Sequence, residues 1–227
     1  MAAPRIVLLH ATPVAIDPVL AAFGRIWPEA ETINLLDDGL SRDRAREPDL
    51  GPAMIERFVA FGHYARLAGA DGLLVTCSAF GPAIDRLARE LPIPVLKPNE
   101  AMFRAALERG RRIAMLATFA PAIGTMEAEF AEFVAETGSK AELTTILVPG
   151  AMDALRAGDA ETHNRLIAAR AADVAGFDAV MLAHFSTSRA AEALGARTDV
   201  AVLSAPEAAV ARMRARIIGA DGPAPHP

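Results

Sequence analysis

Cysteine is almost absent from this 227-residue chain, which has Cys77 alone. A single cysteine excludes a disulfide within the chain and a metal site built from several cysteines, and it suits a reducing cytosol. No apolar run reaches 18 residues, and the apolar part of the N-terminal segment MAAPRIVLLH is too short for a signal peptide. We therefore expect a soluble, cytoplasmic protein that has no membrane partner.

Positive charge is also in short supply, since 23 Lys and Arg residues face 28 Asp and Glu residues and leave a net charge of −5. This balance argues against a nucleic-acid partner. Histidines are few and none has a metal-binding spacing such as HExxH, so we predict no metal; they are His10, His63, His163, His184 and His226. Hydrophobic residues make up 52% of the chain, which excludes disorder and supplies a substantial core.

One stretch, DGLLVTCSAFGP from Asp71 to Pro82, combines a strand pattern with polar residues at its end. A short apolar run is followed by Thr76, Cys77 and Ser78, and a helical pattern then begins. Ligands bind beyond the carboxyl ends of strands in open α/β sheets. The lone thiol is therefore either a small buried apolar group or a reactive group beside a helix N-terminus, where the helix dipole lowers a thiol pKa.

Strand and helix patterns alternate along the whole chain, which predicts parallel sheets with helices on both faces. Strands are expected at 5–10, 31–36, 73–76, 95–96, 112–116, 143–148, 177–182 and 200–203. Helices are expected at 15–26, 52–68, 83–90, 99–109, 121–136, 152–157, 160–174, 187–194 and 205–218. Residues 37–51 hold charges and glycines and are expected to form an exposed loop, a possible lid, with Arg42, Arg44 and Arg46 facing solvent.

The second half of the chain repeats the first at an offset of 107 residues. Arg5 and Ile6 match Arg112 and Ile113, and Asp71 matches Asp178. The pairs Val95-Leu96 with Val202-Leu203 and Glu100-Ala101 with Glu207-Ala208 keep the same offset. We therefore expect two similar α/β lobes related by a pseudo-twofold axis, one formed by residues 1–97 with 206–227 and the other by 98–205.

The offset carries Cys77 onto His184, in the segment VMLAHFSTS. Both residues follow the third strand of their half, so they would face a common cleft if the lobes meet about a pseudo-twofold axis. A histidine after an apolar strand also has the simpler interpretation of a hydrogen-bonded structural group. The match to the only cysteine favours a functional one.

The chain resembles the aspartate/glutamate/hydantoin racemase superfamily over nearly its whole length. The resemblance lies in the duplicated halves, in VTCSAFG around Cys77, in MLAHFSTS around His184 and in MLATFAPAIG around Thr118. It also covers the loop LDDGL and the following helix with IERF. It implies two lobes with the active site between them, no cofactor or metal, and a homo-oligomer. In this family two cysteines, one in each lobe, usually exchange a proton with the carbon next to a carboxylate or carbonyl.

The sequence departs from the family pattern, because His184 stands where the second cysteine is expected. A decarboxylase branch of the superfamily uses one cysteine but keeps it in the second half, whereas Cys77 lies in the first. Three readings stay open: a racemase or epimerase, a one-sided decarboxylase or cis–trans isomerase, and a binding protein for small carboxylates without turnover.

Removal of a proton next to a carboxylate needs a base close to the carbon and donors for the developing negative charge. We expect Cys77 and His184 to be the acid/base pair of an enzyme acting on a small carboxylate. Hydroxyl groups at the same strand ends and His10 are the candidate substrate-binding groups, and the hydroxyl residues are Ser78, Thr118, Ser186 and Thr187. Each hydroxyl could instead cap a helix, which is the expectation for Thr187, and His10 could be structural.

Overall fold

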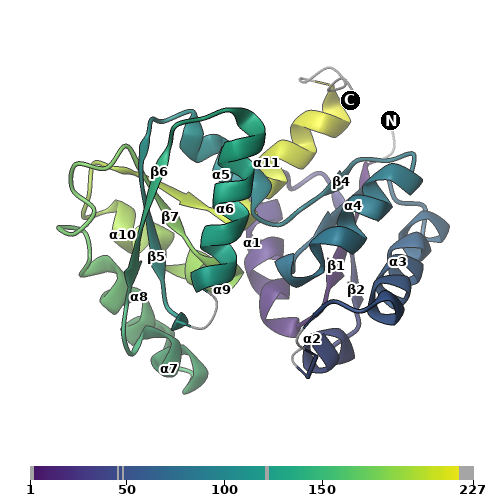
Figure 1. Ribbon diagram of the computed structural model, residues 1–227, viewed down its shortest axis with the longest axis horizontal. Helices are drawn as coiled ribbons and strands as arrows, with labels where there is room; N and C mark the ends of the chain where they lie inside the picture. Colours follow the sequence, from purple (N-terminus) through teal and green to yellow (C-terminus); the bar gives the residue numbers. More distant parts are fainter. Residues whose placement is uncertain (1–2, 45, 48, 121–122, 220–227) are drawn as a thin grey trace. The chain divides into compact units, whose positions relative to one another are not determined.

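The structure, a computed structural model, describes residues 3–44, 46–47, 49–120 and 123–219. Within these residues the strands form two parallel sheets of four strands each, flanked by helices (Figure 1). The chain divides into a first unit, Met1–Asn99 with Ala209–Pro227, and a second unit, Glu100–Ala208. The predicted α/β fold with parallel sheets is therefore confirmed. No helix in the described ranges is long and apolar enough to cross a membrane.

The sheet of the first unit has the strand order β2-β1-β3-β4. Its inner strands are buried along most of their length, whereas β2 at the edge is partly exposed. Inner parallel strands are covered on both faces and so need successive apolar side chains, which explains the runs in β1 and β3. The strands are β1 (Arg5–His10), β2 (Glu31–Leu36), β3 (Gly72–Val75) and β4 (Val95–Leu96).

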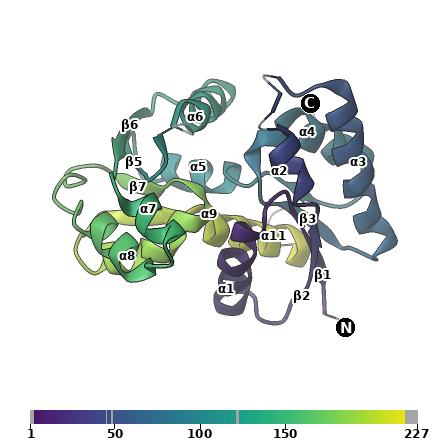
Figure 2. The ribbon, with the colours of Figure 1, turned by 90° about the horizontal axis from the view of Figure 1, so that it is seen from below.

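Helices cover both faces of this sheet (Figures 1 and 2). One face carries α2 (Gly39–Arg44), α3 (Pro52–Leu67) and α4 (Gly81–Glu90), which share an apolar cluster with alternate residues of β1 and β3. The other face carries α1 (Ile16–Ile26) and the end of α11 (Ala205–Ile218). Met213 of α11 lies so close to Gly72 that an added Cβ would be 2.7 Å from its sulfur.

The second unit repeats this plan with the strand order β6-β5-β7-β8. On one face, α7 (Ala151–Arg156), α8 (Ala160–Ala168) and α10 (Ala191–Gly195) surround an apolar cluster. On the other lie α5 (Glu100–Leu107) and α6 (Ile123–Thr137) (Figure 2). Phe103 of α5 meets Phe130 of α6 edge to face, with the ring centres 5.3 Å apart. The strands are β5 (Arg112–Ala117), β6 (Glu142–Leu147), β7 (Ala179–Leu182) and β8 (Ala201–Ser204).

The strand registers reproduce the 107-residue offset. Ile6 pairs with Gly72 in the first sheet and Ile113 with Ala179 in the second, and both partners are shifted by 107. The second strands do not follow, because Glu31 of β2 corresponds to Glu142 of β6, an offset of 111. The expected repeat without a shift is therefore wrong at this strand: four extra residues precede β6 and four fewer follow it.

Two aspartates show why the repeat is recognisable in the sequence. Asp71 accepts a hydrogen bond from the backbone N–H of Arg5 at 2.8 Å, and Asp178 accepts one from the N–H of Arg112 at the same distance. Each aspartate joins the start of the first strand to the start of the third. The hydrogen bonds to Arg112 are the main cause of the lowered pKa of Asp178.

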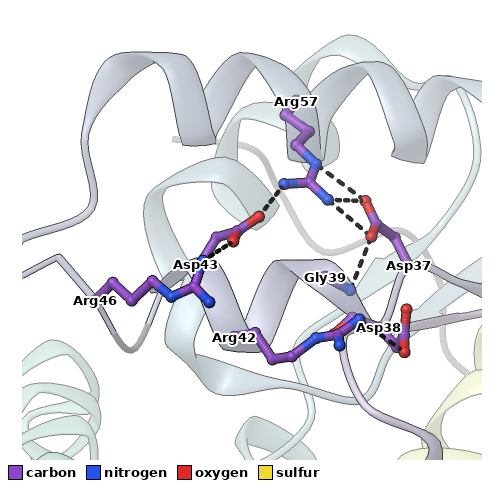
Figure 3. Close-up of polar contacts among 7 residues, drawn as sticks. All are labelled: Asp37, Asp38, Gly39, Arg42, Asp43, Arg46 and Arg57. Carbon is purple, nitrogen blue, oxygen red and sulfur yellow. Dashed lines mark hydrogen bonds and ion pairs between the residues drawn. The ribbon is translucent and has the colours of Figure 1, made fainter.

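Residues 37–51 do not form the exposed loop that we expected. They include α2, whose Leu40 is completely buried. Arg57 of α3 binds Asp37 through two nitrogens, the shortest contact being 2.6 Å, and Asp43 at 2.7 Å (Figure 3). The hydrogen bond from Arg57 is the largest cause of the lowered pKa of Asp43. Glycine, proline and charge predicted a loop here, but one apolar residue and one arginine hold a short helix against α3.

Two helical segments of the second unit differ from expectation. The helix expected at 160–174 ends at Ala168, and turns follow as far as Gly176, which has a φ of +86°. The helix expected at 187–194 begins earlier and in pieces, as α9 (His184–Thr187), a 3-10 turn and α10. The expected helix start at Pro121 lies outside the described residues, and α6 begins at Ile123.

Gly110 gives a test of the contact at Asp178. Its φ is +155°, and an added Cβ would lie 2.5 Å from Cγ of Asp178. We expect Gly110→Ala to lower the free energy of unfolding by about 2 kcal/mol more than Gly138→Ala. Gly138 is the matched control, because it also has a positive φ, +65°, but open space around it. Chemical denaturation measures both, and equal losses would contradict the close contact.

Candidate active site

Cys77 lies at the carboxyl edge of the first sheet, one residue beyond Thr76, which follows β3. Its backbone is extended, with φ −132° and ψ 120°, and it precedes the 3-10 turn Ser78–Phe80 that leads into α4. The side chain is half-buried and packs against the apolar cluster of the α3 and α4 face. Ser78 is also half-buried. The thiol thus has an apolar wall and retains access from one side, an arrangement that a reacting group can use.

His184 occupies the position that follows β7 in the second unit. Its φ of 67° makes it the one non-glycine residue with a positive φ among the described residues. Such a backbone costs about 1–3 kcal/mol and persists only where the surroundings hold it. Its Nε2 is buried and has no hydrogen-bond partner within the protein, and burial lowers the pKa of the imidazole. A neutral, strained histidine with an unused nitrogen is suited to bind or deprotonate a ligand.

Two hydroxyl groups accompany His184 at the same edge of the second sheet. Leu116 of β5 pairs with Leu182 of the parallel strand β7. Thr118 lies two residues after Leu116 and His184 two residues after Leu182, so both residues follow neighbouring strands at the same edge of the sheet. The Oγ1 atoms of Thr118 and Thr187 are buried and lack hydrogen-bond partners, as Nε2 of His184 does. Buried polar atoms are paired in most proteins, so three unpaired ones at a strand edge suit a bound polar ligand.

Thr187 does not cap a helix as we expected. It precedes the 3-10 turn Ser188–Ala190 in a helical conformation, and its side chain makes no capping hydrogen bond. The hydroxyl of Ser188 instead donates to the carbonyl of Phe185 at 2.7 Å. Ser186 is half-buried. Thr187 is therefore a better candidate for ligand binding than its sequence position indicated.

His10 lies inside the first unit, with both ring nitrogens close to polar protein atoms. The side chain is completely buried, and its two nitrogens lie 2.9 Å from Oγ1 of Thr76 and 2.9 Å from Oδ1 of Asn34. Burial lowers the pKa of His10, against a smaller opposite effect of Asn34. Because both nitrogens are already in use, the structure supports the structural role rather than direct substrate binding.

The helical pattern around His163 predicts a surface position for this residue, but it is completely buried on α8. Its Nδ1 lies 2.8 Å from Oδ1 of Asn164, its Nε2 has no partner, and burial lowers its pKa. His63 is half exposed and lies 2.7 Å from the carboxylate of Glu90. A helical pattern alone did not reveal that position 163 faces the packed interior.

Arg156 is a candidate that the sequence did not reveal. It ends α7, and its guanidinium lies 5.2 Å from the centre of the Phe119 ring, next in sequence to Thr118. None of the ion pairs within the described residues involves Arg156. An arginine held on an aromatic ring without a carboxylate partner can receive an anion. No motif marks this residue, because the contact joins two segments 37 positions apart.

A hollow of about 570 Å³ lies at the opposite edge of the second sheet. Its walls are alanines of α8 and the following turns, with Arg197, Thr198 and Asp199. It contains none of the histidine, cysteine or unpaired hydroxyl groups described above. We therefore place the candidate chemistry at the carboxyl edges of the sheets and not in this hollow.

Comparison with known proteins identifies the family. No curated protein matches the sequence. The profile of the Asp/Glu/Hydantoin racemase family matches residues 24–174, about two thirds of the chain. The chain belongs to this family. The resemblance noted from the motifs is thereby confirmed.

Solved structures of the family and its neighbours share the fold. Allantoin racemase from Klebsiella pneumoniae matches with a TM-score of 0.70 at 16% identity, and the match covers 96% of this chain and 89% of the racemase chain. An aspartate racemase homologue from Pyrococcus horikoshii OT3 has a TM-score of 0.69 at 17% identity, with 96% and 100% covered. A double mutant of arylmalonate decarboxylase has a TM-score of 0.68 at 17% identity, with 98% and 96% covered.

Each unit has its own candidate residues at the carboxyl edge of its sheet. They are Thr118, His184 and Thr187 in the second unit and Cys77 with Ser78 in the first. The pairing of Cys77 with His184 across the units stays a prediction. In the part of the chain that the structure describes, no three His, Cys, Asp or Glu side chains gather as they would around a metal ion.

The buried histidines predict loss of stability at acid pH. Burial lowers the pKa of His10, His163 and His184 below the ordinary value of about 6.5. The unfolded chain then binds more protons than the native one below pH 6.5, so the free energy of unfolding falls as the pH falls. The slope is about 1.4 kcal/mol per pH unit for each histidine that stays neutral in the native state.

Urea denaturation between pH 7.5 and pH 5.5 measures this loss while the carboxylates stay ionised. His163→Leu removes one of the three groups, and we expect it to reduce the pH dependence by about a third. A free energy of unfolding that is constant or rises toward pH 5.5 would contradict the neutral state of these histidines.

Proposed function

We propose that this chain is a racemase-like enzyme that moves a proton at the carbon next to a carboxylate or carbonyl of a small molecule, with Cys77 and His184 as the acid/base pair. Family membership supports the reaction class. The observation that carries the residue assignment is that the strained His184, with its unpaired Nε2, occupies the strand-end position equivalent to Cys77. Thr118, Thr187 and backbone N–H groups would hold the carboxylate.

The proposed proton transfers use two forms of the enzyme with the same number of protons. With a neutral His184 and a Cys77 thiol, the imidazole removes the substrate proton and the thiol donates one to the opposite face. With a Cys77 thiolate and an imidazolium, the transfers run in the other direction. The lowered pKa of His184 favours the first form. The total proton count is equal in both, so the pH does not choose between the two enantiomers.

A second candidate is one-sided chemistry, in which Cys77 alone donates a proton after loss of carbon dioxide. The similarity to arylmalonate decarboxylase supports it. In that structure a cysteine replaces a glycine of the decarboxylase and a serine replaces a cysteine. A chain with its thiol in the first half and a different residue in the second is compatible with such an arrangement. A binding protein without turnover is the third outcome.

The first test is deuterium incorporation. Single enantiomers of aspartate, glutamate and a 5-substituted hydantoin, together with an arylmalonate, are incubated in D₂O and followed by NMR. We expect deuterium at the α carbon of recovered substrate and loss of optical purity. Release of carbon dioxide alone would favour the lyase. Cys77→Ser should lower the exchange rate at least about 100-fold, because it removes the acid/base thiol.

His184 offers a sharp pair of variants for this test. His184→Asn removes the imidazole but keeps a residue that tolerates a positive φ, so the fold should be retained while exchange is lost. His184→Cys introduces the second cysteine that the family usually has and should keep measurable exchange. Full turnover in both Cys77→Ser and His184→Asn would refute the assignment.

Arg156 is proposed to bind an anionic group of the substrate from its position on Phe119. We expect Arg156→Gln to lower kcat/KM at least about 10-fold for a substrate with a second carboxylate, because a charge-assisted contact is lost. A neutral hydantoin should be affected far less. Arg197→Gln is the matched control, since it removes the same charge from the opposite edge of the sheet. Equal effects of the two variants would exclude a specific role of Arg156.

A further inference from the structure

A hydrogen-bond network runs beside Cys77 across three segments of the first unit, from the exposed Asn34 of β2 through the buried His10 of β1 to the buried Thr76. His10 of β1 is completely buried, and its Nδ1 lies 2.9 Å from Oγ1 of Thr76, which follows β3. Its Nε2 lies 2.9 Å from Oδ1 of Asn34 on β2. Because Oδ1 of Asn34 can only accept, Nε2–H of His10 donates to it and Nδ1 accepts from the hydroxyl of Thr76, so a neutral imidazole with one N–H satisfies both contacts. No nitrogen of this ring is left for a substrate.

The second unit shows that the fold does not require this network. The positions equivalent to His10 and Thr76 are Ala117 and Ala183, at the offset of 107. The position equivalent to Asn34 is Thr145, whose buried Oγ1 has no partner. The second sheet nevertheless has the same strand order and the same β5–β7 register as its counterpart. The network of the first unit therefore serves something that the second unit lacks.

The feature that distinguishes the first unit at this edge is Cys77, the residue after Thr76. The backbone N–H of Thr76 donates to the carbonyl of Leu9 at 3.1 Å, and its hydroxyl lies 3.3 Å from the same oxygen. The hydroxyl has one proton, so its bond to His10 is the second anchor of Thr76, beside the backbone bond to Leu9. Thr76 directly precedes Cys77, so the network holds the backbone from which the thiol emerges. The counterpart His184 is instead set by its own positive φ.

We propose that the Asn34–His10–Thr76 network positions the thiol of Cys77, which makes His10 and Thr76 positioning residues for the reaction. The proposal rests on the role given to Cys77 under the proposed function. It assigns His10 an indirect part in catalysis, through Thr76, and none in contact with the substrate. A displacement of a reacting group by about 1 Å can cost a factor of about 100 in rate, so a small loss of anchoring has a measurable effect.

The lone cysteine makes the test specific, because an alkylating reagent has one thiol to attack. The rate of reaction with iodoacetamide is measured from pH 6 to pH 10 in wild type and in Thr76→Val, which keeps the side-chain shape and removes the hydroxyl. We expect the rate at the high-pH plateau to rise at least about threefold, because the half-buried thiol becomes less sheltered. Asn34→Ala, on the exposed edge strand, should shift the rate in the same direction with less effect on folding.

Two controls separate positioning from general stability. Thr76→Ser keeps the hydroxyl and should restore the wild-type alkylation rate. Thr145→Val makes the same Thr-to-Val change in the second unit, at the position equivalent to Asn34, where the hydroxyl has no partner, and should leave the rate unchanged. Where turnover is measured, Thr76→Val should lower kcat about 10- to 100-fold with KM altered less than about threefold.

An alkylation profile that is the same in Thr76→Val and wild type overturns the proposal, even if Thr76→Val is less stable. An equal change in Thr145→Val overturns it as well, since it would point to a general loss of stability. Alkylation needs no turnover, so these results are independent of the proposed reaction. A chain with no deuterium exchange but an altered thiol would refute the function and retain the positioning.

Discussion

The pairing of the first strand with the third in each unit is the constraint on which the rest of the structure depends. These strands, β1 with β3 and β5 with β7, lie in the middle of their sheets and are buried on both faces. Asp71 and Asp178 tie their starting ends together through backbone hydrogen bonds. Because the register is fixed at the start, the residues after the third strand emerge at equivalent places. Those residues are Cys77 and His184.

The two sheets have the same strand order but different polar residues at their carboxyl edges. In the first unit the buried His10 is paired with Thr76 and Asn34, and the backbone of Cys77 is extended. In the second unit Thr118, His184 and Thr187 have unpaired polar atoms, and His184 has a strained backbone. Unpaired groups and strain lower stability and are found where a ligand can compensate for them. The duplication has thus kept the architecture and allowed the edges to diverge.

The sequence was sufficient to predict the fold, because apolar runs and glycines mark the strands and turns and because the repeat can be recognised from residue types alone. β1 and β2 lie at the expected residues, and the offset of 107 led directly from Cys77 to His184. It was insufficient where a single contact decides the outcome. Leu40 and Arg57 turn an apparent loop into α2, and the burial of His163 depends on how α8 packs. The roles of His10 and Arg156 depend on neighbours distant in sequence, which no local pattern records.

The last helix has a consequence for the order in which the molecule can be completed. Residues 209–219 belong to the first unit, and Met213 packs on Gly72 of its central strand. The first sheet therefore lacks part of one covering layer until residues 209–219 have been synthesised, whereas the second unit is contiguous from Glu100 to Ala208. During synthesis from the N-terminus, the first unit would begin to form before the second but would be completed after it. Its exposed apolar face is then the surface most in need of protection from association during that interval.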